Sequence, residues 1–77
     1  MPWKSIVPQV IVLSKTRFND VQECIDWLKE RGFAFDKFVD TPASFRAIQL
    51  PVEKFRKRTF RTTSVAYGVS IINGRLI

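Results

Sequence analysis

Five basic side chains gather within eight residues of the C-terminal half of the sequence: Lys54, Arg56, Lys57, Arg58 and Arg61. Phosphate groups of nucleic acids attract such a cluster, because each phosphate that a cation neutralises releases condensed counterions. Phe55 and Phe60 interleave with the cations, and aromatic rings beside basic groups can stack on exposed bases. We therefore predict that this segment, including Phe55, contacts nucleic acid. The alternative is a solvated basic loop that its two phenylalanines anchor to the core, since no named DNA- or RNA-binding motif matches.

Other basic and aromatic residues stand alone. Arg17, Arg46 and Arg75 are interpreted first as surface or ion-pairing arginines, and Arg46 is retained as a further nucleic-acid candidate. Four residues are candidates for a protein interface: Trp27, Ile11, Val12 and Tyr67. Large aromatic side chains often anchor such interfaces. Packing at the edge of the core is the alternative for the aromatic candidates, and Trp3 has similar standing.

The remaining reactive residues offer little catalytic chemistry. The chain has one cysteine, Cys24, and no histidine, which excludes an intrachain disulfide and the usual zinc sites and leaves the thiol without an activating imidazole. On one strand Asp36 and Asp40 would stand roughly 13 Å apart, too far to share a metal ion. There is no glycine-rich phosphate loop. We expect a protein that is not an enzyme, with no metal, cofactor or small-molecule substrate.

Charge is distributed unevenly along the sequence. Residues 19–40 carry six acidic and three basic side chains, whereas residues 41–77 carry seven basic side chains and the single acid Glu53. The net charge of the whole chain is +6. A chain with separate acidic and basic segments could present a basic face to a polyanion or bind its own copies head to tail.

The length of 77 residues predicts a single domain, residues 1–77. The apolar run at residues 10–13 is too short for a signal-peptide core or a membrane span. A lone cysteine fits a reducing compartment better than secretion. We therefore expect a protein without membrane contact that is located in a reducing compartment, such as the inside of a cell.

One amphipathic helix is expected over residues 20–31. Its apolar stripe has helical spacing and consists of Val21, Cys24, Ile25 and Leu28. Asn19 is the expected N-cap, with Gln22 as its partner in a capping box. Gly32 followed by Phe33 is typical of a Schellman ending, in which Phe33 packs back on Leu28.

Four segments are expected to be strands: residues 5–14, 33–39, 44–50 and 62–71. Residues 52–59 are compatible with either a loop or one helical turn. Asn73-Gly74 predicts a hairpin turn, after which residues 75–77 fold back in a short hairpin or pair elsewhere. The expected fold is α+β in β-α-β-β-β order, with one helix packed on a small, mostly antiparallel sheet.

Several short motifs support a family resemblance, and they lie at residues 27–33, 36–41, 44–49, 51, 60–62 and 68–76. Together they resemble a short uncharacterised domain of tailed-phage and large-DNA-virus proteins, often found in or beside head-maturation proteins and sometimes attached to a prohead protease. The resemblance covers about residues 19–77. In the strand where that domain typically has tyrosines and a second arginine, only Phe45, Arg46 and Gln49 keep their places. The resemblance implies a viral protein, located in the host cytoplasm or within a virion, and a structural protein as its partner. It implies no protease activity, because protease residues do not accompany the domain.

Two functions are consistent with these features. The first is a small, basic, non-catalytic viral or phage-type module that contacts nucleic acid through the basic and aromatic segment. The alternative is a virion structural or assembly protein that binds a capsid protein or itself, which the apolar run, the uneven charge and the resemblance favour. A regulator directed at the host is a third class that no residue singles out.

Overall fold

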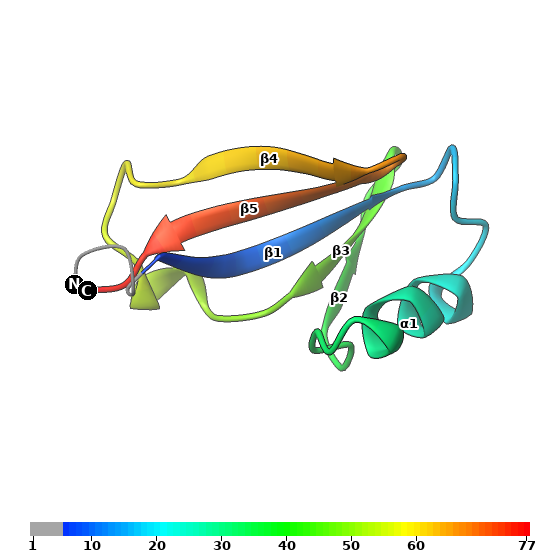
Figure 1. Cartoon of the computed structure of the whole chain (residues 1–77), viewed down its shortest axis with the longest axis horizontal. Coiled ribbons are helices and arrows are strands. Elements are labelled where there is room, and N and C mark those ends of the chain that lie inside the picture. Colours follow the sequence, from blue (N-terminus) through cyan, green and yellow to red (C-terminus); the bar gives the residue numbers. More distant parts are fainter. Residues whose placement is uncertain (1–5) are drawn as a thin grey trace.

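The computed structural model describes residues 6–77, which form five strands and one helix (Figure 1). The strands are β1 (Ile6–Ser14), β2 (Phe38–Asp40), β3 (Ser44–Ile48), β4 (Arg61–Ala66) and β5 (Val69–Arg75). The helix α1 spans Val21–Glu30, and a single 3-10 turn, η2, spans Val52–Lys54. The strands form one sheet in the order β2-β3-β1-β5-β4, and every pairing is antiparallel. This confirms the predicted α+β class, one helix on an antiparallel sheet, with one strand more than predicted.

The N-terminus of α1 is capped one residue later than predicted. Asp20 has an extended backbone, and its carboxylate accepts a hydrogen bond from Glu23 N at 2.9 Å. The Glu23 carboxylate in turn accepts one from Asn19 N at 2.7 Å. The capping pair is therefore Asp20 with Glu23, and Gln22 instead donates to Asp26. Carboxylates accept stronger hydrogen bonds than amides and are favoured by the helix dipole, which explains the shift.

The C-terminus of α1 has the predicted Schellman ending. Gly32 has a φ of +78°. Phe33 N donates to Leu28 O at 3.0 Å, and Gly32 N donates to Lys29 O at 3.3 Å. The Phe33 ring is stacked parallel to Trp27 with ring centroids 6.2 Å apart.

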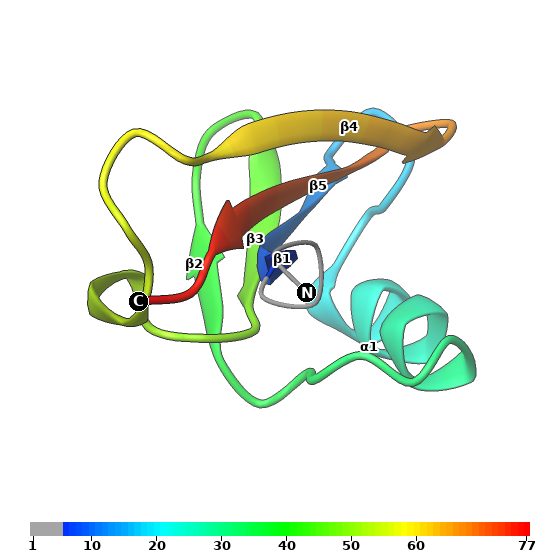
Figure 2. The same ribbon diagram turned by 60° about the vertical axis from the view of Figure 1, so that its left-hand side comes forward.

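The hydrophobic core lies between α1 and one face of the sheet (Figure 2). Its buried members are Ile11, Leu13, Phe18, Cys24, Trp27, Leu28, Phe45, Ala47 and Val69. Alternate residues of a strand face opposite sides, and the register places Ile11 opposite both Ala47 and Ile71 on the helix side. Burial, followed by the nearby carboxylates Glu23 and Asp20, raises the pKa of the Cys24 thiol to about 11.

Two predicted strands are shorter in the structure. Strand β2 begins only at Phe38, because the Gln49 side chain occupies both backbone groups of Ala34, accepting from its N and donating to its O at 2.9 Å each. Strand β3 ends at Ile48, after which Gln49 N donates to Gln9 O at 2.8 Å. The predicted beginning of the first strand at residue 5, and Trp3, lie outside the described residues.

The predicted hairpin turn at Asn73-Gly74 is wrong. The chain reverses at Tyr67-Gly68, between the paired residues Ala66 and Val69, so that the expected strand 62–71 is divided into β4 and β5. Gly68 has a φ of +71°, a left-handed conformation that residues other than glycine rarely adopt. Gly74 lies inside β5, and residues after it pair elsewhere, with Ile77 N donating to Lys54 O at 3.0 Å.

Candidate nucleic-acid interface

The basic segment is held against the end of β5 by hydrogen bonds of its backbone and of the Thr59 side chain. Arg56 N donates to Arg75 O at 2.8 Å. The Thr59 hydroxyl donates to Arg56 O at 2.7 Å and accepts from Arg75 N at 3.1 Å. Residues 52–59 therefore combine both predicted possibilities, the 3-10 turn η2 followed by a loop. We call residues 54–61 the basic loop.

The prediction that Phe55 contacts nucleic acid is wrong. Its side chain is 4% exposed, and its ring lies 5.5 Å from that of Phe60. Both rings pack over Gly74, where an added Cβ would come within 2.6 Å of Phe55 Cδ1 and 2.9 Å of Phe60 Cε1. Phe55 therefore anchors the basic loop to the sheet and is not available to stack on a base.

All five cations of the basic loop are exposed: Lys54, Arg56, Lys57, Arg58 and Arg61. Within residues 6–77 the ion pairs are formed elsewhere, by Lys15 with Asp40 and by Arg31 with Glu30. The basic loop thus presents its positive charge to solvent without a carboxylate partner in the described part of the chain.

The structure separates the acidic and basic segments in space. The molecule is elongated, with principal extents of 37, 24 and 21 Å. Helix α1, which carries exposed Glu23, Asp26 and Glu30, lies at one end of the long axis, and the loop that precedes β4 lies at the other (Figure 1). Because Glu23, Asp26 and Glu30 lie on the far helix, they cancel little of the field around the basic loop. The acid next to this loop in the sequence is Glu53, in η2.

Arg46 is not part of this basic surface. It pairs with Val12, and the neighbours of Val12 along β1, Ile11 and Leu13, face the helix. Arg46 therefore projects from the helix-free face of β3. By the same alternation Arg61 lies on the helix side, because it is opposite Asn73 and hence on the side of Ile71 in β5.

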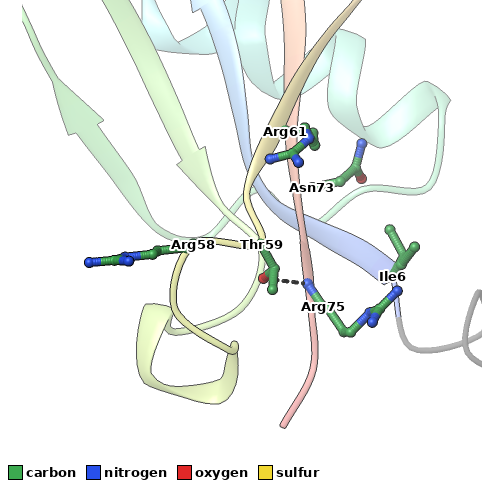
Figure 3. Close-up of a pocket in the computed structure, with 6 residues that line it drawn as sticks. All are labelled: Ile6, Arg58, Thr59, Arg61, Asn73 and Arg75. Carbon is green, nitrogen blue, oxygen red and sulfur yellow. Dashed lines mark hydrogen bonds between the residues drawn. The ribbon is translucent and has the colours of Figure 1, made fainter.

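Sequence reasoning missed Arg75 as part of this surface. It lines a hollow of about 320 Å³ beside β4 and β5, together with Ile6, Arg58, Thr59, Arg61 and Asn73 (Figure 3). In Figure 3 the Arg58 side chain points away from the side chains of Arg61, Asn73 and Arg75. The alternation of side chains along a strand would have placed Asn73 and Arg75 on one face. The Asn73-Gly74 pair instead predicted a hairpin turn, so these residues were not treated as part of one strand.

The four predicted interface residues are not equally accessible. Ile11 is fully buried and Trp27 is 8% exposed, both within the core. They cannot contact a partner in this conformation, which corrects the prediction for these two residues. Val12 is half-buried on the helix-free face, and Tyr67 is 75% exposed at the β4–β5 turn.

Among residues 6–77 no group of three or more metal-ligating side chains is close enough to hold an ion. None of the helices in this range is long and apolar enough to cross a membrane. Comparison with family models, curated proteins and solved structures finds no match to the chain. The resemblance to a phage and viral domain therefore remains a prediction.

Proposed function

We propose that this protein is a non-catalytic nucleic-acid-binding module of a phage or viral type, and that the basic loop binds the phosphate backbone. One observation carries the proposal. Five exposed cations without ion-pair partners among residues 6–77 lie within residues 54–61, the basic loop, at the end of the molecule opposite the acidic helix. Such a local positive field attracts a polyanion and raises the rate of encounter.

Phosphate contact is favoured over base recognition. Phe55 is buried and Phe60 is half-buried against it, so the two aromatic rings anchor the loop to the sheet. The lysines and arginines that remain can neutralise phosphates without reading sequence. Binding should therefore be tolerant of sequence and should weaken steeply as salt concentration rises.

A salt series with a matched pair of double variants tests this proposal. Labelled single-stranded and duplex oligonucleotides are titrated with wild type, with Lys54→Gln/Lys57→Gln, and with Lys29→Gln/Lys37→Gln. All four lysines are exposed, and both variants lose the same charge, but Lys29 and Lys37 lie outside the basic loop. The loop variant should reduce the slope of log affinity against log salt by about 1.8 on duplex if both lysines contact phosphates.

The matched control variant should retain the wild-type slope. Equal losses in the two variants would show that net charge alone drives binding and would contradict a local site. Absence of binding by wild type at low salt would remove the nucleic-acid proposal altogether.

A second candidate function, an assembly module that self-associates, is favoured by strand β4. It forms one edge of the sheet, and residues 61–65 are all exposed. An open edge offers unpaired backbone groups to a strand from another chain. The mass in the same buffer should then exceed 9.0 kDa, and Val65→Lys, at an exposed edge position, should reduce it. A monomeric wild type would exclude this candidate.

A further inference from the structure

Two arginines and an asparagine share one face of β4 and β5. Asn73 and Arg75 are two residues apart on β5, so their side chains leave the same side of the strand. Arg61 is directly opposite Asn73 across the β4–β5 ladder. This is the side on which Val69 packs into the core, but α1 lies toward the other end of the sheet (Figure 1). The three side chains therefore line an uncovered hollow (Figure 3).

The arginine side chains in this hollow are hydrogen-bond donors that face no negatively charged group of residues 6–77. No acidic residue lines it. Arg61 Nη1 donates to the neighbouring Phe60 O at 3.1 Å, whereas within residues 6–77 the Arg75 guanidinium and the Asn73 amide make no hydrogen bond or ion pair. Each guanidinium offers five N–H donors in a fixed fork, and the amide offers two more.

The backbone of Arg75 is fixed on both sides. Its N donates to the Thr59 hydroxyl, and its O accepts from Arg56 N at 2.8 Å. Arg75 is also half-buried, which reduces solvent screening of its charge. The volume of about 320 Å³ equals that of about ten water molecules at ~30 Å³ each. The hollow can therefore admit a phosphate group and part of the sugar that carries it.

We propose that Arg61, Arg75 and Asn73 bind a phosphate monoester, the terminal phosphate of a nucleic-acid strand. Arginine forks bind phosphate oxygens in pairs. Two guanidinium charges match the charge of about −1.5 to −2 on a monoester at pH 7 better than the single charge of a backbone diester. Arg58 points away from this group and is left to contact the backbone. The identity of the ligand as a strand end rests on the proposed function.

The test compares oligonucleotides of one sequence that carry a phosphate at the 5′ end, at the 3′ end or at neither. Affinity is measured by fluorescence anisotropy at one salt concentration. A terminal phosphate should tighten binding by about tenfold in wild type. Arg61→Gln and Arg75→Gln should each abolish this ratio, and Arg75→Lys, which keeps the charge without the fork, should give an intermediate ratio. Arg46→Gln, an exposed strand arginine on the other face, should retain the full ratio.

The outcomes separate this site from the proposed function. If the unphosphorylated strand binds with steep salt dependence and no phosphate improves its affinity, nucleic-acid binding stands and the terminal site is overturned. Loss of the ratio in Arg46→Gln would also overturn it. If no strand binds, inorganic phosphate is titrated while the arginine Nε–H signals are followed by NMR. Shifts confined to Arg61 and Arg75 would support the anion site, and unchanged signals would overturn it. Thermal unfolding verifies that each variant is folded.

Discussion

Replacing Gly74 by alanine should destabilise the protein by loosening the anchor of the basic loop. The new Cβ would lie 2.6 Å from Phe55 Cδ1, and 2.9 and 3.0 Å from two atoms of the Phe60 ring. Carbon atoms in ordinary contact are about 3.5–4.0 Å apart, so both rings must move by about 1 Å. Phe55 is 4% exposed, so its ring cannot move away without displacing its neighbours. Overpacking of this kind costs about 1–3 kcal/mol.

The loss should be large relative to the stability of so small a domain. A change of 1 kcal/mol shifts Tm by roughly 4–8 °C at 60–100 residues, so a loss of about 2 kcal/mol predicts a fall of roughly 8–16 °C. Urea unfolding followed by tryptophan fluorescence gives the free energy of unfolding. Phe55→Leu provides the double-mutant partner, because a smaller side chain leaves room for the new methyl group. The two substitutions should therefore destabilise less together than their separate effects predict.

Gly32→Ala separates the steric effect from the loss of glycine itself. Nothing lies within 4 Å of an added Cβ at Gly32, but its φ of +78° is strained for alanine. This control should cost about 1–2 kcal/mol, and Phe55→Leu should not change that cost. A change within about 0.5 kcal/mol for Gly74→Ala, the range of ordinary surface substitutions, would refute the packing argument. So would strict additivity with Phe55→Leu.

Two further predictions concern α1. Asp20→Ala removes the acceptor of the Glu23 N hydrogen bond and should lower the free energy of unfolding by about 0.5–2 kcal/mol, whereas Asn19→Ala should have a much smaller effect in the same urea titration. The reverse order would restore Asn19 as the cap. The pKa of Cys24 is raised to about 11 in the folded protein, whereas that of an unfolded cysteine is about 8.5. The free energy of unfolding should therefore be unaffected by this thiol below about pH 8.5 and should fall as the pH rises toward 11. Reaction with a thiol reagent at pH 8 should be slow in the folded protein and fast in urea, and rapid labelling without denaturant would contradict the burial of this thiol.

Features set by neighbouring residues were predictable. The helix could be located because its apolar residues recur at helical spacing and because Gly32 supplies the positive φ of its ending. Its cap was misplaced by one residue, since Asn19 and Asp20 are both good capping residues. The acidic and basic segments could also be located, because the charge of a side chain is known from the sequence without its position in the fold.

Features set by residues far apart were not predictable in the same way. Asn73-Gly74 has the strongest hairpin signal in the sequence, yet Gly74 is required inside a strand, where Phe55 and Phe60 pack over it. Strand β2 is short because a side chain 15 residues away, Gln49, bonds to the backbone of Ala34. Each outcome depends on a contact that local spacing does not encode.

The sequence by itself determined one amphipathic helix, a sheet of apolar strands and a basic segment at residues 54–61, because periodicity, capping groups and charge are properties of short segments. The tertiary structure decided that Phe55 is an anchor, that Arg46 is on the other face, and that Arg75 joins Arg61 beside one hollow. The faces of Arg46, Arg61 and Arg75 follow from the pairing of β1 with β3 and of β5 with β4 and β1. Register is settled only when distant strands pair and bury their shared face, since a shift of one residue would turn every side chain to the opposite side.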